Sequence, residues 1–370
     1  MKVFLIAFFF SLSYHGYSQS ISQHLQSNTI KVSFPFLLFS PDARSSSLGD
    51  AGVAVSSGQN SFHWNTANIG FSEELGGISV SYSPWLYSLV TDIHLIYVSS
   101  FTKLGSDDRH SLGGSIRYLS DANQPLFNGS SLVSGDFVSN DLELLGGYSF
   151  KISEHSSVGL NGKFIYSDAL QNVSPDSLIV KAAMVGAVDL SYAYMSRKFS
   201  VGKMKGCWSW GAAISNIGNK SFYSTIENKD YLPANLRIGS AFGLDVGADH
   251  KIIVSMDLNK LMVPSSSANV NNISAIQGVF RSFNDSQDGL MGEIKELTIG
   301  GGVEYVYRDL LSLRSGYFYE HPSKGNRRFV SLGAGIKFKS FGLDASYLAS
   351  LTQNNPLSNT MRFTLSYMFN

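Results

Sequence analysis

The sequence has little charge, one cysteine and no long apolar run beyond its N-terminus. Of its 370 residues, 28 are Lys or Arg and 28 are Asp or Glu, so only 15% are charged. A soluble domain carries about 25% charged residues, and a transmembrane helix needs about 18 consecutive apolar residues. Low charge without such runs is typical of a transmembrane β-barrel, in which only alternate residues meet lipid.

Balanced charge and scarce cysteine exclude further classes of protein. A formal net charge of zero lacks the basic footprint of a nucleic-acid-binding protein. The lone Cys207 excludes an internal disulfide and a multi-cysteine metal site, and it falls in a predicted strand as a wall residue. The histidines are scattered, and no nucleophile elbow, P-loop or dinucleotide fingerprint is present. The sequence therefore predicts a protein that is not an enzyme, with no metal and no cofactor.

Residues 1–18 are predicted to be a cleaved signal peptide. Lys2 gives the positive start, residues 3–12 form the apolar core, and the small residues Gly16 and Ser18 flank a cleavage site before Gln19. The alternative, a membrane anchor, would need a longer apolar run. We therefore expect the mature chain to be exported.

From Leu75 to the C-terminus, short segments of alternating apolar and polar residues recur. Ile78 and Val80, for example, alternate with Ser79 and Ser81. Strict alternation indicates half-buried strands, and about 9–11 residues suffice for a tilted strand to cross a membrane. The polar faces carry mostly Ser and Gly, which favours a barrel with a filled interior over a soluble sandwich. The fourteen predicted antiparallel strands are 75–83, 92–101, 110–120, 139–151, 156–168, 181–195, 206–218, 233–246, 250–259, 296–306, 310–319, 328–339, 340–350 and 361–370.

Connections between the predicted strands are alternately long and short. Bacterial barrels have short periplasmic turns and long external loops. An even number of strands with both termini in the periplasm would therefore place every long loop outside the cell. The long predicted loops are 120–138, 169–180, 219–232, 260–295 and 351–360.

Residues 19–74 precede the barrel strands at 75–370 and are too apolar for a disordered tail. An eight-stranded barrel is filled by its own side chains, whereas fourteen strands leave room for a plug. We expect this segment to lie in the lumen as a hatch, with a periplasmic arm that binds a partner as the alternative. Gly300-Gly301-Gly302 in a predicted strand indicates close packing against the wall or the plug.

Two short helices are predicted within the hatch. Ser40 would cap the first, with Pro41 at its first helical position and Gly49 ending it. Asn60 would cap the second, which would end at Gly70.

Four stretches of this chain match the pattern of a known family. They are 36–44 with 49–54, 63–67, 278–285 with 289 and 293–296, and 353–363. These stretches resemble the family of PorV, the outer-membrane component of the type IX secretion system of Bacteroidota, itself related to fourteen-stranded fatty-acid channels. Thr66 stands where the family has proline, and Gln287-Asp288 replaces its usual proline-glycine. The first two stretches supply the hatch signature residues Pro41, Asp42, Arg44, Trp64 and Asn65.

The resemblance implies a secretion role without catalysis in the outer membrane of a Gram-negative bacterium. Family members bind the C-terminal domain of cargo at a large translocon barrel and pass the cargo to a cell-surface sortase complex. Among loop residues we expect Phe280 and Phe283, then Trp85, Leu86 and Phe127, to contact a partner. Ordinary loop packing or anchoring in the lipid headgroups is the alternative for each.

A transporter of hydrophobic small molecules, like the related fatty-acid channels, is the second hypothesis for the function. A transporter needs a continuous apolar path past the plug to a gap in the wall. A cargo shuttle needs a sealed lumen and adhesive external loops.

Overall fold

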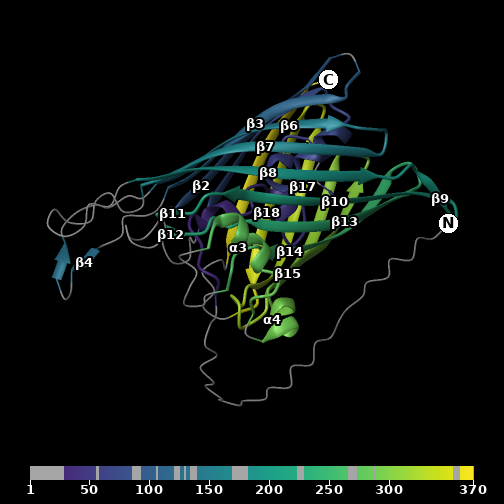
Figure 1. Cartoon of the computed structure of the whole chain (residues 1–370). Coiled ribbons are helices and arrows are strands. Elements are labelled where there is room, and N and C mark those ends of the chain that lie inside the picture. The colour runs from purple at the N-terminus through teal and green to yellow at the C-terminus, as the bar shows by residue number, and fades with distance from the viewer. Residues whose placement is uncertain are drawn as a thin grey trace, which may run out of the picture.

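The chain forms a closed β-barrel with part of the chain inside it, as the computed structural model shows (Figure 1). The predicted signal peptide at residues 1–18 lies outside the described residues. Only the backbone is described for residues 126–128, 131–133 and Phe222. The structure describes residues 29–55, 58–85, 93–105, 107–120, 126–128, 131–133, 140–168, 182–222, 229–265, 273–286, 288–352 and 359–369.

Fourteen antiparallel strands make the barrel wall, which confirms the prediction. Each strand pairs with its neighbours along the chain, and the pairing of β1 with β19 closes the wall. Every strand overlaps one of the predicted strands. The wall strands are β1 (Gly76–Pro84), β2 (His94–Leu104), β3 (His110–Ser120), β6 (Asn140–Lys151), β7 (Ser156–Ser167), β8 (Ala183–Met195), β10 (Met204–Gly218), β13 (Asn235–Val246), β14 (His250–Leu261), β15 (Leu297–Tyr307), β16 (Leu311–Tyr319), β17 (Arg328–Phe338), β18 (Phe341–Ser350) and β19 (Thr360–Phe369).

Short strands extend or decorate this wall. Strand β9 (Phe199–Val201) pairs with the start of β10, so the wall reaches further here than the predicted start at residue 206. The pairs β4 (Leu126–Asn128) with β5 (Ser131–Val133) and β11 (Ser221–Phe222) with β12 (Lys229–Asp230) form two small separate sheets. These additions were not predicted, because two- and three-residue strands carry no measurable alternation.

The two faces of the wall differ as the alternation predicts. In β1, Ile78 and Val80 are exposed on the outside, whereas Ser79 and Ser81 are buried inside. In a transmembrane barrel, the exposed apolar face is the one that meets hydrocarbon. Cys207 lies in β10, half-buried, as a wall residue.

Seven connections lie at one end of the barrel and the short turns lie at the other, because the strands alternate in direction. We call these the long-loop end and the short-turn end. Connections 85–93 and 320–327 join the long-loop end besides the predicted long loops. Connection 262–296 carries α3 (Ala275–Arg281) and α4 (Gly289–Lys295). Among the described residues, no helix has the length and apolarity that crossing a membrane requires.

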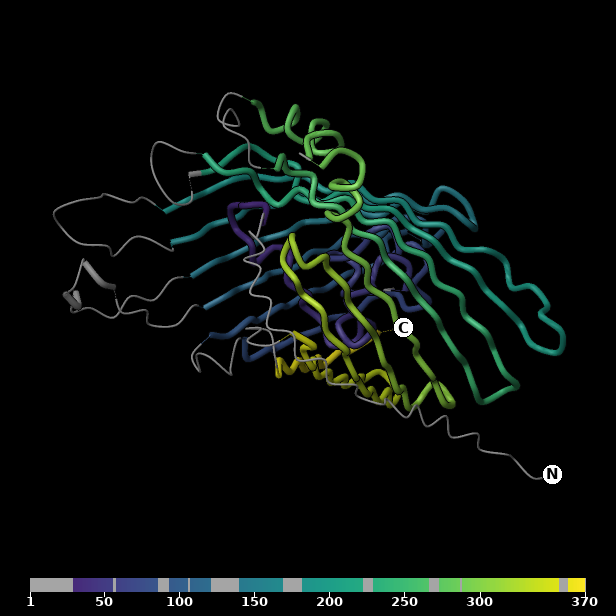
Figure 2. Tube along the Cα trace, turned by 90° about the horizontal axis from the view of Figure 1, so that it is seen from below, coloured from purple at the N-terminus to yellow at the C-terminus, as the bar shows by residue number. Residues whose placement is uncertain are grey.

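The described part of the N-terminal segment, residues 29–55 and 58–74, lies inside the barrel as a plug. The purple segment runs among the strands in both views (Figure 2). It contains four short helical elements, and its buried side chains form two hydrophobic clusters with the inner wall. The elements are η1 (Pro35–Leu38), α1 (Ala43–Ser46), α2 (Ser61–Trp64) and η2 (Thr66–Phe71).

The helix ends in the plug correct the predicted ones. Asp42, not Ser40, caps α1, because the Asp42 side chain accepts a hydrogen bond from the Ser45 backbone N–H at 2.8 Å. Pro41 therefore precedes the cap instead of starting the helix. The predicted second helix is two elements, because extended backbone at Asn65 ends α2 and starts η2.

Glycines let the plug approach the wall closely. Gly49 follows α1 with a φ of 70°, a left-handed conformation that favours glycine. A Cβ on Gly302 would lie 2.8 Å from Leu48 Cα, and Gly300 faces the backbone of Gly49. The predicted close packing at residues 300–302 is therefore present, although Gly301 points away from the plug toward Met256.

Candidate functional site

The hatch signature residues meet inside the lumen. Asp42 is buried, and its second carboxylate oxygen accepts a hydrogen bond from Trp64 Nε1 at 2.7 Å. Asn65 donates from Nδ2 to the carbonyls of Val53 and Tyr192, both at 3.0 Å. Asn65 thereby joins two parts of the plug to strand β8. One carboxylate and one amide thus fix the fold of the plug.

Thr66 supports the turn in which the family has proline. Its Oγ1 donates to Asn161 Oδ1 of β7 at 2.8 Å, an additional bond that proline has no side-chain hydroxyl to make. Asn65 Oδ1 accepts from the Ala67 backbone N–H at 3.1 Å and caps η2. The turn therefore forms without the proline.

Arg44 connects the plug to a row of charges on the wall. Arg44 Nη2 lies 2.8 Å from Glu304 Oε2 in β15. Glu304 also pairs with Arg314 of β16 at 2.7 Å, and Arg314 pairs with Asp344 of β18 at 2.6 Å. The four charges neutralise one another in a largely buried setting, which such groups require.

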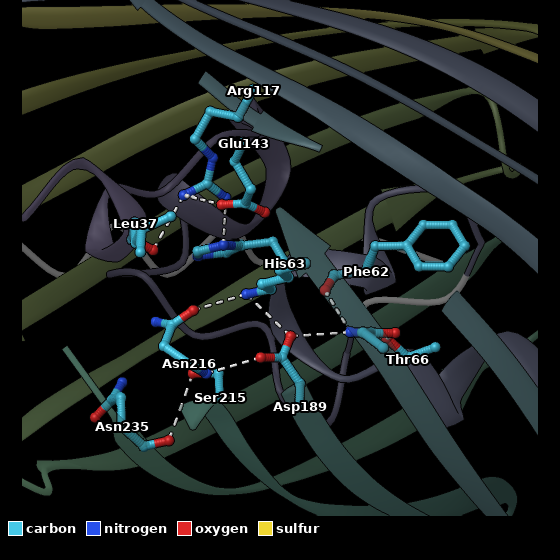
Figure 3. A network of polar contacts seen from close by, with 12 residues as sticks. Leu37, Phe62, His63, Thr66, Arg117, Glu143, Asp189, Ser215, Asn216 and Asn235 are labelled. Carbon is cyan, nitrogen blue, oxygen red and sulfur yellow. Dashed lines mark hydrogen bonds and ion pairs between the residues drawn. The ribbon is translucent and has the colours of Figure 1, made fainter. Parts of the chain in front are cut away.

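A second polar network lies around His63 (Figure 3). Arg117 of β3 donates to the carbonyls of Phe36 and Leu37 and lies 2.6 Å from His63 Nδ1. From the other side, Arg237 of β13 donates to the His63 carbonyl at 2.9 Å. Two buried arginines from opposite parts of the wall therefore hold the same plug helix.

Asp189 and Asn216 lie below His63 in Figure 3. Lys163 of β7 pairs with Asp189 of β8 at 2.9 Å and donates to Asn216 at 2.8 Å. Asp257 of β14 accepts from the backbone N–H groups of Gly52 and Val53. The plug is thus bonded to the wall on many sides.

These lumen charges are the residues that sequence reasoning missed. The polar faces were expected to be mostly Ser and Gly, yet many strands place a charged residue on the inward side. The signal was present, because most of these charges sit between two apolar residues that face outward. The inward charges include Arg117, Asp141, Glu143, Lys163, Asp189, Arg237, Asp257, Glu304, Arg314, Asp344 and Arg362.

At the long-loop end, α3, α4 and the residues between them carry exposed apolar side chains. Phe280 is 74% exposed and Leu290 is 79% exposed. A capping box between Ser274 and Gln277 begins α3, and Gly278 lets that helix approach Tyr231. We call the exposed apolar residues of α3, α4 and the link between them the helix-pair surface. They are Ile276, Phe280, Phe283, Leu290, Met291 and Ile294.

Buried ion pairs fix α4 below this surface. Lys260 of β14 lies 2.7 Å from Glu293 and 2.8 Å from Glu296, and Lys324 lies 2.9 Å from Glu296. Burial opposes the charge of Glu293, but the Lys260 ammonium and two backbone N–H groups outweigh it, so its pKa falls below 4.5. Burial raises the pKa of Asp285 above 3.8.

Asp285, Glu293 and Glu296 bring three carboxylates together, a grouping that the sequence did not reveal. Such a group can hold a cation, but here two lysine ammonium groups already compensate two of the carboxylates. The arrangement therefore works as an ionic tie between α4, β14 and the connection at 320–327.

The other expected contact residues do not join the helix-pair surface. Trp85 is only 4% exposed, because it stacks on Phe39 of the plug at 4.2 Å and lies under Arg362. This is the packing that the sequence left as the alternative for Trp85, and its contact with a partner stays a prediction. Leu86 lies outside the described residues, and only the backbone of Phe127 is described, in β4.

A closed wall of fourteen strands around a bonded plug defines a plugged β-barrel of the outer-membrane channel type. The family model of the type IX secretion system protein PorV matches residues 22–268. Because this match spans more than half of the sequence, the chain belongs to that family. It is therefore an outer-membrane component of type IX secretion.

Solved structures that this chain resembles include two toluene transporters and a FadL homologue. The P. putida toluene transporter TodX is 13% identical, with 90% of this chain and 98% of TodX covered and a TM-score of 0.50. The Ralstonia pickettii toluene transporter TbuX is 12% identical over 90% and 98%, with a TM-score of 0.48. A Pseudomonas aeruginosa FadL homologue is 11% identical over 91% and 99%, with a TM-score of 0.45. At 13% identity, the likeness to TodX shows the fold alone. No curated protein matches the sequence.

Proposed function

We propose that this protein binds the C-terminal domain of secreted cargo at the translocon and passes the cargo to the surface attachment complex, without catalysing a reaction. The helix-pair surface is the observation that carries the proposal. Large apolar side chains that are exposed on a loop and its helices are typical of an interaction site. Membership of the PorV family supplies the secretion context.

The energetics suit a protein partner. Burying one Phe side chain contributes about 1.5–3 kcal/mol, and interfaces are enriched in aromatic residues and Met. Phe280 and Phe283 would supply the aromatic contacts, with Met291 beside Leu290 on α4. The ionic tie through Lys260 holds α4 in place before a partner arrives, which lowers the ordering cost of binding.

The proposed partners follow from this placement. With the long loops outside the cell, as is usual for bacterial barrels, the helix-pair surface would face the cell exterior of a Gram-negative bacterium. Cargo C-terminal domains, the large translocon barrel and the cell-surface sortase are the proposed protein partners. Outer-membrane lipid would contact the wall.

The test is capture of a purified cargo C-terminal domain by the detergent-solubilised barrel. We expect the double substitution Phe280→Asp with Phe283→Asp to weaken binding about a hundredfold, because about 3 kcal/mol of apolar contact is lost. Leu351→Asp, an exposed apolar residue of another connection at the same end, is the matched control and should bind normally. Heat-dependent gel mobility verifies folding of each variant. Equal binding by all variants would remove the helix-pair surface from the function.

Transport of hydrophobic small molecules remains the competing proposal, and the fold alone is compatible with it. The paired lumen charges argue for the shuttle, because an apolar solute would have to pass Arg117, Glu304 and their partners. Vesicles that contain the barrel separate the two functions. Uptake of a hydrophobic dye by the barrel, together with no cargo capture, would favour transport.

A further inference from the structure

A groove crosses the outer, lipid-facing side of β2, β3, β6, β7 and β8. Most outward positions of the wall hold large apolar side chains, but these five strands hold small residues in mid-strand. Strand register places Ser100 opposite Gly114, Gly114 opposite Gly146, and Gly146 opposite Gly162. The resulting cavity has a volume of about 900 Å³ and also reaches Gly186.

Apolar side chains form the edges of the groove. Val98, Ile116, Leu144 and Phe164 line the edge nearer the long-loop end, each two residues from the row of small residues. Ile217 lies at the far end, where a bulge in β10 shifts the register. The only charged residue in the lining, Lys163, pairs with Asp189 inside the lumen and brings no charge to the outer face.

The protein's own packing does not explain two of these glycines. A Cβ added to Gly146 or Gly162 would meet no atom within 4 Å. Glycine within a strand costs roughly 0.5–1 kcal/mol relative to Ala, and it often marks a place where a ligand approaches the backbone. The open space beside these two glycines is therefore available to a molecule outside the chain.

We propose that the groove binds an acyl chain of an outer-leaflet lipid. The groove is continuous with the apolar belt that meets hydrocarbon, so acyl chains surround it on every side. Five strands at about 4.8 Å spacing give a length of about 19 Å. With strands tilted by about 45°, this length projects to about 14 Å along the membrane normal, close to half of the roughly 30 Å hydrocarbon core. The groove thus matches one leaflet, and its edge toward the long loops selects the outer one.

Photolabelling tests the site. The barrel is reconstituted in vesicles of phosphatidylethanolamine that carries a diazirine in one acyl chain, irradiated, and mapped by peptide mass spectrometry. We expect peptides from β3, β6 and β7 to be labelled several-fold more than peptides from β16 to β18. Gly146→Leu and Gly162→Leu should remove this excess, because the new side chains fill the groove.

Ala334→Leu is the matched control, since Ala334 is an exposed outward residue of β17 on another part of the wall. It should leave the labelling of the groove unchanged. Heat-dependent gel mobility verifies folding of every variant. Labelling that is even around the wall, or that persists in both Gly→Leu variants, would overturn the proposal. A photoreactive residue at Leu144 that cross-links to a protein in native membranes, and not to lipid, would also overturn it.

Discussion

Replacing Glu304 with Gln should loosen the plug, because this carboxylate holds two arginines together. Glu304 is almost fully buried and pairs with Arg44 of the plug and Arg314 of the wall. Gln keeps the volume of the side chain and removes its charge. Two guanidinium groups would then share the carboxylate of Asp344, which lies 2.6 Å from Arg314.

The size of the effect follows from the burial of the pair. Removing one partner of a buried ion pair costs about 3–5 kcal/mol. In the variant, Asp344 would compensate part of the positive charge that Arg44 and Arg314 carry, and the Arg44 side chain is 29% exposed to solvent. We therefore expect Glu304→Gln to lower the free energy of unfolding by about 2–4 kcal/mol. Adding Arg44→Met should recover at least about 1 kcal/mol of this loss, since contacting residues couple.

Urea unfolding in detergent micelles measures these changes. Tryptophan fluorescence is a suitable signal, because Trp64 is buried in the plug. Arg197→Met is the matched control, since Arg197 and Glu154 form an ion pair in which both side chains are 77% exposed. Such surface pairs contribute little. A Glu304→Gln barrel that unfolds like the control, or a double variant whose losses simply add, would refute the ionic tie between plug and wall.

Two further predictions concern the plug core and the helix pair. Phe62→Ala should cost about 3–5 kcal/mol in the same unfolding assay, because Phe62 is buried against Gly113 and Gly147; a loss below about 1 kcal/mol would contradict this packing. The lowered pKa of Glu293 means that its stabilisation of α4 is present above pH 4.5 and is lost as the pH falls through the lowered value. Proteolysis of α4 should therefore speed up in acid, and Glu293→Gln should remove that pH dependence. An unchanged acid response in the variant would exclude Glu293 as its cause.

The wall could be predicted from the sequence because its rule is local. Alternation with a period of two residues decides which side chain faces lipid. The outward position of Ile78 and the inward position of Ser79 can therefore be predicted without knowledge of the partner strand. Antiparallel neighbours along the chain then fix the topology. Strand ends also depend on pairing with a neighbouring strand, so their bounds were predicted less accurately. The pairing of β9 with the start of β10 is an example.

The plug contacts could not be predicted, because they join residues far apart in the chain. Arg44 and Glu304 are 260 positions apart, and no local pattern encodes that pairing. Trp85 illustrates the same limit. Its position between strands suggested an exposed loop residue, but Phe39 from the plug covers it. The exposed faces of α3 and α4 depend likewise on where Tyr231 and Lys260 place the two helices.

The plug and the groove use the same thin part of the wall. Just inside the outer row that contains Gly146, the register places Gly113 opposite Gly147 on the inner face. A Cβ on either inner glycine would lie 2.7 Å from the Phe62 ring, so the plug requires the inner glycines. The outer Gly146 has no such neighbour. Little more than backbone therefore separates the Phe62 ring of the plug from the membrane. The stretch of wall that contacts the plug on its inner face also forms the groove on its outer face.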